Sequence, residues 1–158
     1  MITPQTLSQS PLFAGLTEQQ LAPFIDVVAE ITCARGQALF REGEEARQLF
    51  ILLEGRVSIQ VQPTSRLEPI SIASISQFGQ LVGWSGFMPP NYYTATALCQ
   101  ENSRLLAIDG AAFMRLLEAD PALGFTVMRR ISEVISGRLR NIQRVVLKTF
   151  ETPSGGEF

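Results

Sequence analysis

Six short runs of apolar and β-branched residues, separated by turn-forming residues, occupy the chain between residues 37 and 109. They read QALFREG, QLFILLEG, RVSIQVQ, PISIASIS, TATALCQ and SRLLAID. In RVSIQVQ the apolar residues Val57, Ile59 and Val61 alternate with polar ones, which is typical of a strand with one buried face. Short strands at such close and regular spacing predict an antiparallel barrel or jelly roll rather than a parallel sheet with crossover helices.

Helical patterns flank this β region on both sides. Thr17 fits the first position of a capping box, which indicates the start of an N-terminal helix. Asp109 is a candidate N-cap for a helix that follows the last strand, and Asp120 with Pro121 is typical of the start of another. This final helix is expected to run to about Thr149, and it is then longer than a small barrel can cover.

The patterns together predict a single domain over residues 1–150. The β jelly roll is expected at 30–108 and the C-terminal helices at 110–150. Residues 151–158 read ETPSGGEF, a composition that predicts a flexible tail.

The composition excludes several kinds of chemistry. The chain has no histidine, which excludes Ser-His and Cys-His catalysis and every metal site with histidine ligands. Its two cysteines, Cys33 and Cys99, show no metal-ligand spacing and predict free thiols in a reducing compartment. The first residues do not form a signal peptide, and no apolar run has the length of a membrane span. We therefore expect a cytoplasmic protein that is not an enzyme and holds no metal or other cofactor.

Charge is distributed unevenly along the chain. Residues 1–120 contain seven Lys/Arg and twelve Asp/Glu, whereas residues 121–150 contain six Lys/Arg and one Asp/Glu. Arg140, Arg144 and Lys148 recur at intervals of four and share one face of the last helix. This basic face is either a solvated surface or a contact for an acidic partner or nucleic acid.

The last helix also carries an apolar stripe, which Arg138 interrupts. Its inner half can pack on the barrel, and its outer half exposes apolar side chains unless it meets a partner. The alternative is a helix that folds back on its own domain. We expect a homodimer whose interface is formed by Met128, Ile131, Ile135, Leu139 and Ile142.

Several of these features occur together in a known family. The chain combines LSQSPLFAGLTEQQL, GQALFREGEEARQLFILLEGRVSI, an FG turn and two final helices, and it resembles the cyclic-nucleotide-binding domain of the catabolite activator and fumarate-nitrate regulator superfamily. The resemblance covers residues 7–150 and rests on a specific combination of positions: Gly36, Gly43, Glu44, Phe50, Gly55 and Val57. It implies a mainly β, cupin-like jelly roll with an N-terminal helix and a long C-terminal helix, and a ligand cradle that contains a short helix.

The residues that hold a nucleotide in the family differ in this chain. The resemblance implies a glutamate for the ribose hydroxyl and an arginine for the cyclic phosphate, and these positions carry Gln80 and Tyr93. Every residue between Glu68 and Glu101 is neutral, and the cradle segment is lengthened by SGFMPPN. Loss of the charged partner of a buried anion weakens binding by about a hundredfold or more. We expect that the scaffold is kept while its anion chemistry is lost.

The candidate ligand-binding residues are accordingly those of the altered cradle: Phe78, Gly79, Gln80, Leu81, Val82, Gly83, Trp84, Tyr93, Thr94 and Ala95. The large side chains of the 78–97 segment either fill the cradle or form a site for an apolar ligand or a protein partner.

Three functions remain open. The first is a regulatory ligand sensor that does not bind cAMP or cGMP in the usual way, and the second is a dimeric interaction module with an empty pocket. The third is the sensor part of a transcription regulator without its DNA-binding domain. Family members that bind DNA do so through a helix-turn-helix after the long helix, which residues 151–158 are too few to form, so direct DNA binding is not expected of this chain.

Overall fold

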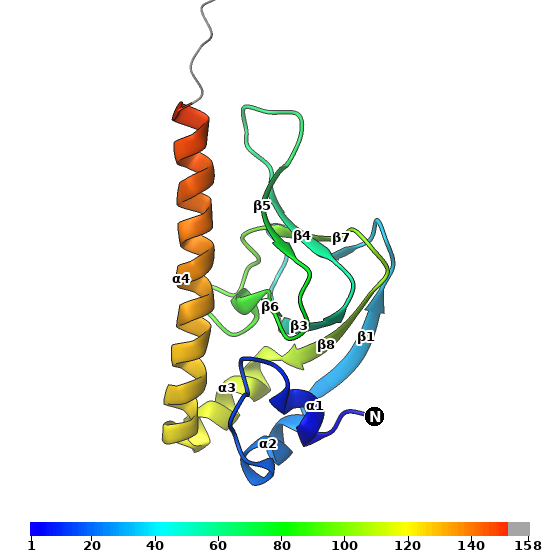
Figure 1. The fold of residues 1–158 in the computed structure, drawn as a ribbon, viewed down its shortest axis with the longest axis vertical. Helices are drawn as coiled ribbons and strands as arrows, with labels where there is room; N and C mark the ends of the chain where they lie inside the picture. Colours follow the sequence, from blue (N-terminus) through cyan, green and yellow to red (C-terminus); the bar gives the residue numbers. More distant parts are fainter. Residues whose placement is uncertain (152–158) are drawn as a thin grey trace, which may run out of the picture.

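The computed structural model describes residues 1–151, and within them eight strands form two four-stranded antiparallel sheets flanked by helices (Figure 1). In chain order the elements are α1 (Pro4–Ser8), α2 (Glu18–Ile25), β1 (Val28–Cys33), β2 (Ala38–Phe40), β3 (Gln48–Glu54), β4 (Val57–Val61), β5 (Ile70–Ile75), β6 (Leu81–Val82), the 3-10 helix η1 (Trp84–Gly86), β7 (Thr96–Cys99), β8 (Ser103–Asp109), α3 (Gly110–Ala119) and α4 (Pro121–Glu151).

The strand order confirms the predicted jelly roll. One sheet has the order β1-β8-β3-β6 and the other has the order β2-β7-β4-β5, so neighbours in space are often distant in the chain. Strand β8 pairs with both β1 and β3, and β4 pairs with both β5 and β7, always antiparallel. The cradle segment, which contains β6 and η1, therefore lies at the edge of the first sheet.

Each of the six runs that predicted strands contains one. The pattern did not predict α1, β1 or β6. The two-residue β6 is too short to show an alternation, and β1 buries its two end residues and exposes most of its middle. The tail was predicted from residue 151, but Glu151 is the last residue of α4, and the rest of that prediction lies outside the described residues.

Two apolar cores stabilise the fold. The first lies between the β1-β8-β3-β6 sheet and the helices and is centred on the rings of Phe13, Phe24, Phe87 and Phe113. The second lies between the two sheets and contains, among others, Phe40, Phe50, Val57, Tyr93 and Leu105. Because η1 and the residues around it contribute to both cores, the cradle segment is tightly packed.

The predicted helix starts are confirmed. Thr17 forms the capping box with Gln20 at the start of α2, and the Asp109 carboxylate accepts from the Ala112 amide at 2.7 Å at the start of α3. The Asp120 carboxylate accepts from the Leu123 amide at 3.2 Å in the first turn of α4. These caps satisfy amide groups that have no partner within the helix.

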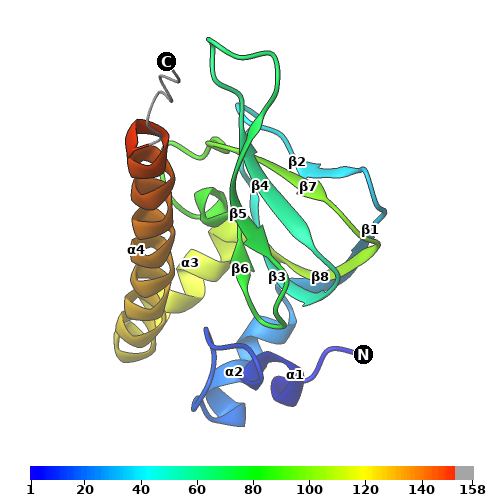
Figure 2. The same ribbon diagram turned by 45° about the horizontal axis from the view of Figure 1, so that its top comes forward.

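Helix α4 stands along one side of the β sandwich and passes β5 and β6 (Figures 1 and 2). Its first half packs on the domain through Leu123, Val127 and Ile131, which are buried. Its second half exposes a set of large apolar side chains: Leu139, Val145, Val146, Leu147 and Phe150. Across residues 1–151 no helix combines the length and apolar character that crossing a membrane requires.

Candidate functional site

The predicted cradle runs from the turn before β6 to the end of η1. Gly79 has a φ of 85° in this turn, and a Cβ atom there would lie 2.6 Å from Pro11 Cδ. Leu81 and Val82 follow as β6, which pairs with Ile51 and Phe50 of β3 and is buried. The segment is therefore fixed both by backbone pairing and by the N-terminal residues that pack on it.

The Gln80 side chain is used inside this turn. Its amide oxygen accepts hydrogen bonds from the backbone amides of Ser76 at 3.0 Å and Gln77 at 2.8 Å. In the family this position carries a glutamate whose carboxylate is expected to hold the ribose. Here the corresponding side-chain oxygen of Gln80 stabilises the turn instead. Only the NH₂ end of Gln80 remains for contacts outside it.

Tyr93 lies inside the second core. Its ring is stacked on Phe40, with 3.8 Å between ring centroids and 11° between ring planes. Its hydroxyl donates to the Gln48 carbonyl at 2.7 Å, and the residue is 6% exposed. Burial raises the pKa of the Tyr93 hydroxyl, so this group remains neutral at physiological pH. Tyr93 thus fills the space at the position where the resemblance implies an arginine.

Little empty space remains between these side chains. Gly83 packs so closely on the stacked rings that a Cβ atom there would lie 2.9 Å from Phe40 Cε1. The remaining cavity has a volume of about 30 Å³. It is lined by Phe40, Ile59, Gly83, Trp84, Ser85, Tyr93, Thr94, Ala95 and Arg138. A small-molecule site is usually about 300 Å³ or larger, so the cradle is closed in this conformation.

A family model described as the cyclic nucleotide-binding domain matches residues 30–120, more than half of the chain. The chain belongs to the cyclic nucleotide-binding domain family. The match covers the jelly roll except for the first two residues of β1, and it includes all of α3. This confirms the predicted cyclic nucleotide-binding domain and its fold class.

Known relatives extend the comparison. A protein named as a potassium channel protein, from Rhodopseudomonas palustris, is 26% identical over 132 residues, which are 84% of this chain and 30% of that protein. A protein from Geobacter metallireducens GS-15, described as a cyclic nucleotide-binding protein, has a crystal structure with 29% identity and a TM-score of 0.75, covering 88% of this chain and 99% of that one. The N-terminal domain of a transcriptional regulator from Streptomyces coelicolor A3(2) has 24% identity and a TM-score of 0.67, covering 96% and 99%. The chain thus spans under a third of the channel protein and nearly all of the two solved chains.

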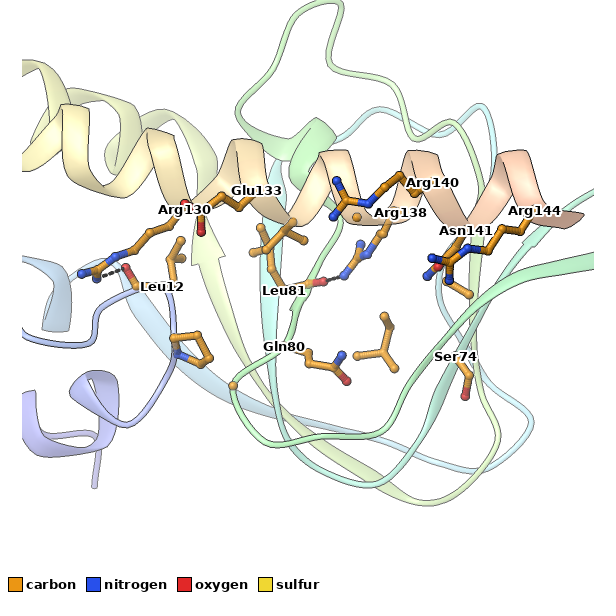
Figure 3. Close-up of a pocket in the computed structure, with 16 residues that line it drawn as sticks. Leu12, Ser74, Gln80, Leu81, Arg130, Glu133, Arg138, Arg140, Asn141 and Arg144 are labelled. Carbon is orange, nitrogen blue, oxygen red and sulfur yellow. Dashed lines mark hydrogen bonds between the residues drawn. The ribbon is translucent and has the colours of Figure 1, made fainter.

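One contributor to the cradle of this cyclic nucleotide-binding domain comes from outside the predicted site. Arg138 of α4 lies in the cavity wall, with its guanidinium carbon 4.9 Å from the centroid of the Trp84 ring. The same guanidinium donates to the Leu81 carbonyl oxygen (Figure 3). Desolvation lowers the pKa of Arg138 to about 10, which still leaves the guanidinium charged at neutral pH. The sequence signal for this residue was its interruption of the apolar stripe.

The other predicted ligand residues fall into two groups. Ala95 is buried in the second core, and Trp84 is partly buried beneath Arg138. Phe78 is 42% exposed and Thr94 is also exposed, and neither faces an enclosed ligand site of nucleotide size. The structure therefore places the predicted residues along one segment, but it does not arrange them around an open pocket.

The inserted SGFMPPN segment is buried in part and exposed in part. Phe87 is buried and its ring lies 5.6 Å from that of Phe113, centroid to centroid, in the first core. Met88 and Tyr92 are exposed, and Tyr92 forms an isolated β-bridge with Glu45. Of the two interpretations of these large side chains, packing accounts for Phe87, and the exposed pair remains available to a partner.

The five residues predicted to form a dimer interface do not share one environment. Ile131 is 1% exposed within its own chain, so it has no surface for a partner and must be removed from the predicted interface. Met128 and Ile135 are partly buried against the same domain core. Ile142 is partly exposed and Leu139 is 55% exposed. Most of the exposed apolar side chains of α4 therefore lie in its second half, although Phe125 in the first half is also exposed.

Proposed function

We propose that this chain is a non-catalytic regulatory module of the cyclic nucleotide-binding type whose cradle does not take cAMP or cGMP in the usual way. The observation that supports this most directly is the Tyr93 ring, which is stacked on Phe40 inside the cradle. A cyclic nucleotide would have to displace this ring, and it would then meet no cation at position 93 and no carboxylate at position 80. The cost of both changes opposes binding.

Arg138 does not restore the missing charge in the closed cradle. Its guanidinium is engaged with the Leu81 carbonyl and the Trp84 ring. The volume of about 30 Å³ beside it is too small for a phosphate with its ribose and base. A nucleotide would enter only after Tyr93 and Arg138 had both moved.

cAMP and cGMP at about 1 mM, added separately, are expected to leave the backbone amide NMR signals of Gly83, Thr94 and Ala95 unchanged, because these residues line the closed cradle. Titration of ¹⁵N-labelled protein checks this residue by residue. Saturable shifts at these three amides would overturn the proposal. Shifts confined to other parts of the chain would not, because the readout is local to the cradle.

A second proposed property is homodimerisation through the second half of α4. The exposed side chains of Leu139, Val146 and Phe150 recur at intervals that place them on one face of the helix. Pairing this face with the same face of a second copy would remove its apolar surface from water, which is energetically favourable.

Leu139→Asp is expected to convert a dimer into a monomer, because it puts a charge into this apolar face. Size-exclusion chromatography with light scattering measures the mass. Asn141→Asp is the matched control, since it adds the same charge about 200° further around the helix and should leave the mass unchanged. A monomeric wild type, or a dimeric Leu139→Asp variant, would refute this interface. Ile135→Asp is a poorer probe because Ile135 packs on its own domain core.

A further inference from the structure

A pair of free thiols lies outside the cradle, at one corner of the β sandwich. Cys33 is the last residue of β1 and Cys99 is the last residue of β7, so the two thiols belong to different sheets. Strands β1 and β7 end at the same corner of the sandwich, on the side away from α4 (Figures 1 and 2). Both cysteines are buried in the second core. The fold thus brings together two nucleophilic side chains that are distant in the sequence.

The backbone around Gln37 holds the two cysteines together. The Cys33 thiol donates to the Gln37 carbonyl oxygen at 3.7 Å, and the Cys99 backbone amide donates to the same oxygen at 2.9 Å. The Gly36 amide in turn donates to the Cys99 carbonyl oxygen at 2.8 Å. The Cys99 thiol forms a hydrogen bond with Cys33 itself. The two sulfur atoms are therefore direct neighbours, and only a short approach separates them from the S–S distance of a disulfide, about 2.05 Å.

One of the two thiols borders a depression in the surface. Cys33 lines this depression, whose volume is about 440 Å³, together with Asn102, Ser103 and Arg104. Cys33 is 7% exposed, whereas Cys99 is 1% exposed and does not line the depression. The volume is within the usual range of small-molecule sites. A small reagent that enters from solvent therefore meets Cys33 before Cys99.

The Cys99 thiol is held in its protonated form. Burial, and after it the hydrogen bond with Cys33, raises the pKa of the Cys99 thiol to about 12. A cysteine attacks a disulfide only as its thiolate, so Cys99 is a poor first nucleophile at neutral pH. The first attack is left to Cys33, which is also the more accessible of the two.

We propose that Cys33 and Cys99 are a redox-responsive pair, which a low-molecular-weight disulfide of the glutathione class converts to an intrachain disulfide. The Cys33 thiolate first attacks one sulfur of the reagent, whose S–S bond breaks; one half leaves as a thiolate and the other stays on Cys33. The Cys99 thiolate then attacks the Cys33 sulfur, and the second half leaves. The two cysteines lose two protons and two electrons, and the reagent takes them up as two thiols. Because little Cys99 thiolate is present, the second step is the slow one.

The link would join the two sheets around the cradle. It would run from the β1-β8-β3-β6 sheet to the β2-β7-β4-β5 sheet. The closed loop would contain residues 34–98, which include β2 to β6, η1 and the whole cradle segment. A cross-link that closes a long loop reduces the conformational freedom of the unfolded chain. The oxidised domain should therefore be more stable than the reduced one, which makes the stability of the cradle's scaffold depend on redox state.

Equilibration of the folded protein with graded ratios of oxidised to reduced glutathione tests this. Samples are quenched with acid, and mass spectrometry follows the intact mass and the linked peptides. We expect a transient glutathione adduct on Cys33, followed by loss of both thiols and a final mass lower by about 2 Da, the two protons removed. The linked protein should unfold at a temperature higher by about 5 °C or more, and dithiothreitol should reverse the change.

Single variants separate the roles of the two cysteines. Cys99→Ser should stop at the glutathione adduct on Cys33, because no second thiol is present to displace it. Cys33→Ser should react more slowly than Cys99→Ser by about tenfold or more, since its remaining thiol is buried and protonated. Cys99→Ala and Cys33→Ala serve if the serine variants do not fold.

Four results would each overturn the proposal. These are the absence of a link between positions 33 and 99 at the most oxidising ratio, a link that forms only in urea, a stable adduct on both cysteines, and a disulfide between two chains in place of the intrachain one. Faster reaction of Cys33→Ser than of Cys99→Ser would overturn the assigned order of attack.

Discussion

Replacing Gly110 with alanine is expected to lower the free energy of unfolding by about 3 kcal/mol or more. A Cβ atom at Gly110 would lie 1.7 Å from the Gly86 carbonyl oxygen and 2.5 Å from its carbonyl carbon. A Cβ atom at Gly86 would in turn lie 2.3 Å from the Gln48 carbonyl group. The backbones of β3, η1 and the start of α3 thus pass each other at a separation that only glycine permits, and no side-chain rotation can relieve the clash.

Urea denaturation followed by circular dichroism measures this loss. Gly137→Ala is the matched control, because it adds the same methyl group to a helix where only Arg140 lies within 4 Å, at 3.8 Å. That change should stabilise the protein by up to about 1 kcal/mol. If Gly110→Ala unfolded at the same urea concentration as the wild type, the close backbone packing around η1 would be wrong.

Tyr93→Ala is expected to destabilise the protein by about 3–5 kcal/mol, the range for removal of a large buried aromatic side chain. The change removes the ring stacked on Phe40 and the hydroxyl bond to the Gln48 carbonyl. The surrounding strands cannot collapse fully into the space, since β4 and β7 are held in place by their pairing within one sheet. The same variant should enlarge the cradle cavity, which is about 30 Å³ in the wild type.

Tyr93→Phe separates the two contributions. It keeps the stacked ring and loses only the hydroxyl bond, so its expected cost is about 1 kcal/mol. Denaturant midpoints of the two variants, measured under the same conditions, give the difference. Equal and small losses for both would show that the Tyr93 ring is not part of the core, and the cradle would then have to be regarded as open.

Much of the fold follows from local patterns. The runs around Leu52, Ile59 and Leu105 predicted strands because the apolar residues and the turn residues bounding them are adjacent in the chain. Asp109 and Asp120 predicted helix starts for the same reason, since a cap acts within three residues of its own position. The order of the strands in the two sheets was not predicted, because no local pattern contains it.

The candidate site was less predictable because its determinants are contacts between distant residues. Arg138 reaches the Leu81 carbonyl across 57 positions of sequence, and nothing near either residue indicates this contact. The exchange of the anchors for Gln80 and Tyr93 was visible in the sequence, but their present roles as a turn cap and a core ring depend on Ser76, Gln48 and Phe40. Ile131 was predicted to meet a partner because a single helix pattern cannot tell which neighbour covers it.

The contact of Arg138 with Trp84 and Leu81 fixes the middle of α4 to the cradle segment. The helix continues for 13 residues beyond Arg138 to Glu151, a distance of about 20 Å at 1.5 Å per residue. A tilt of α4 by about 10° around the Arg138 contact would move the C-terminal end of the helix by about 3.5 Å, roughly the rise of two residues. A tilt of this size would displace the exposed apolar half of α4 far enough to change what it can pack against.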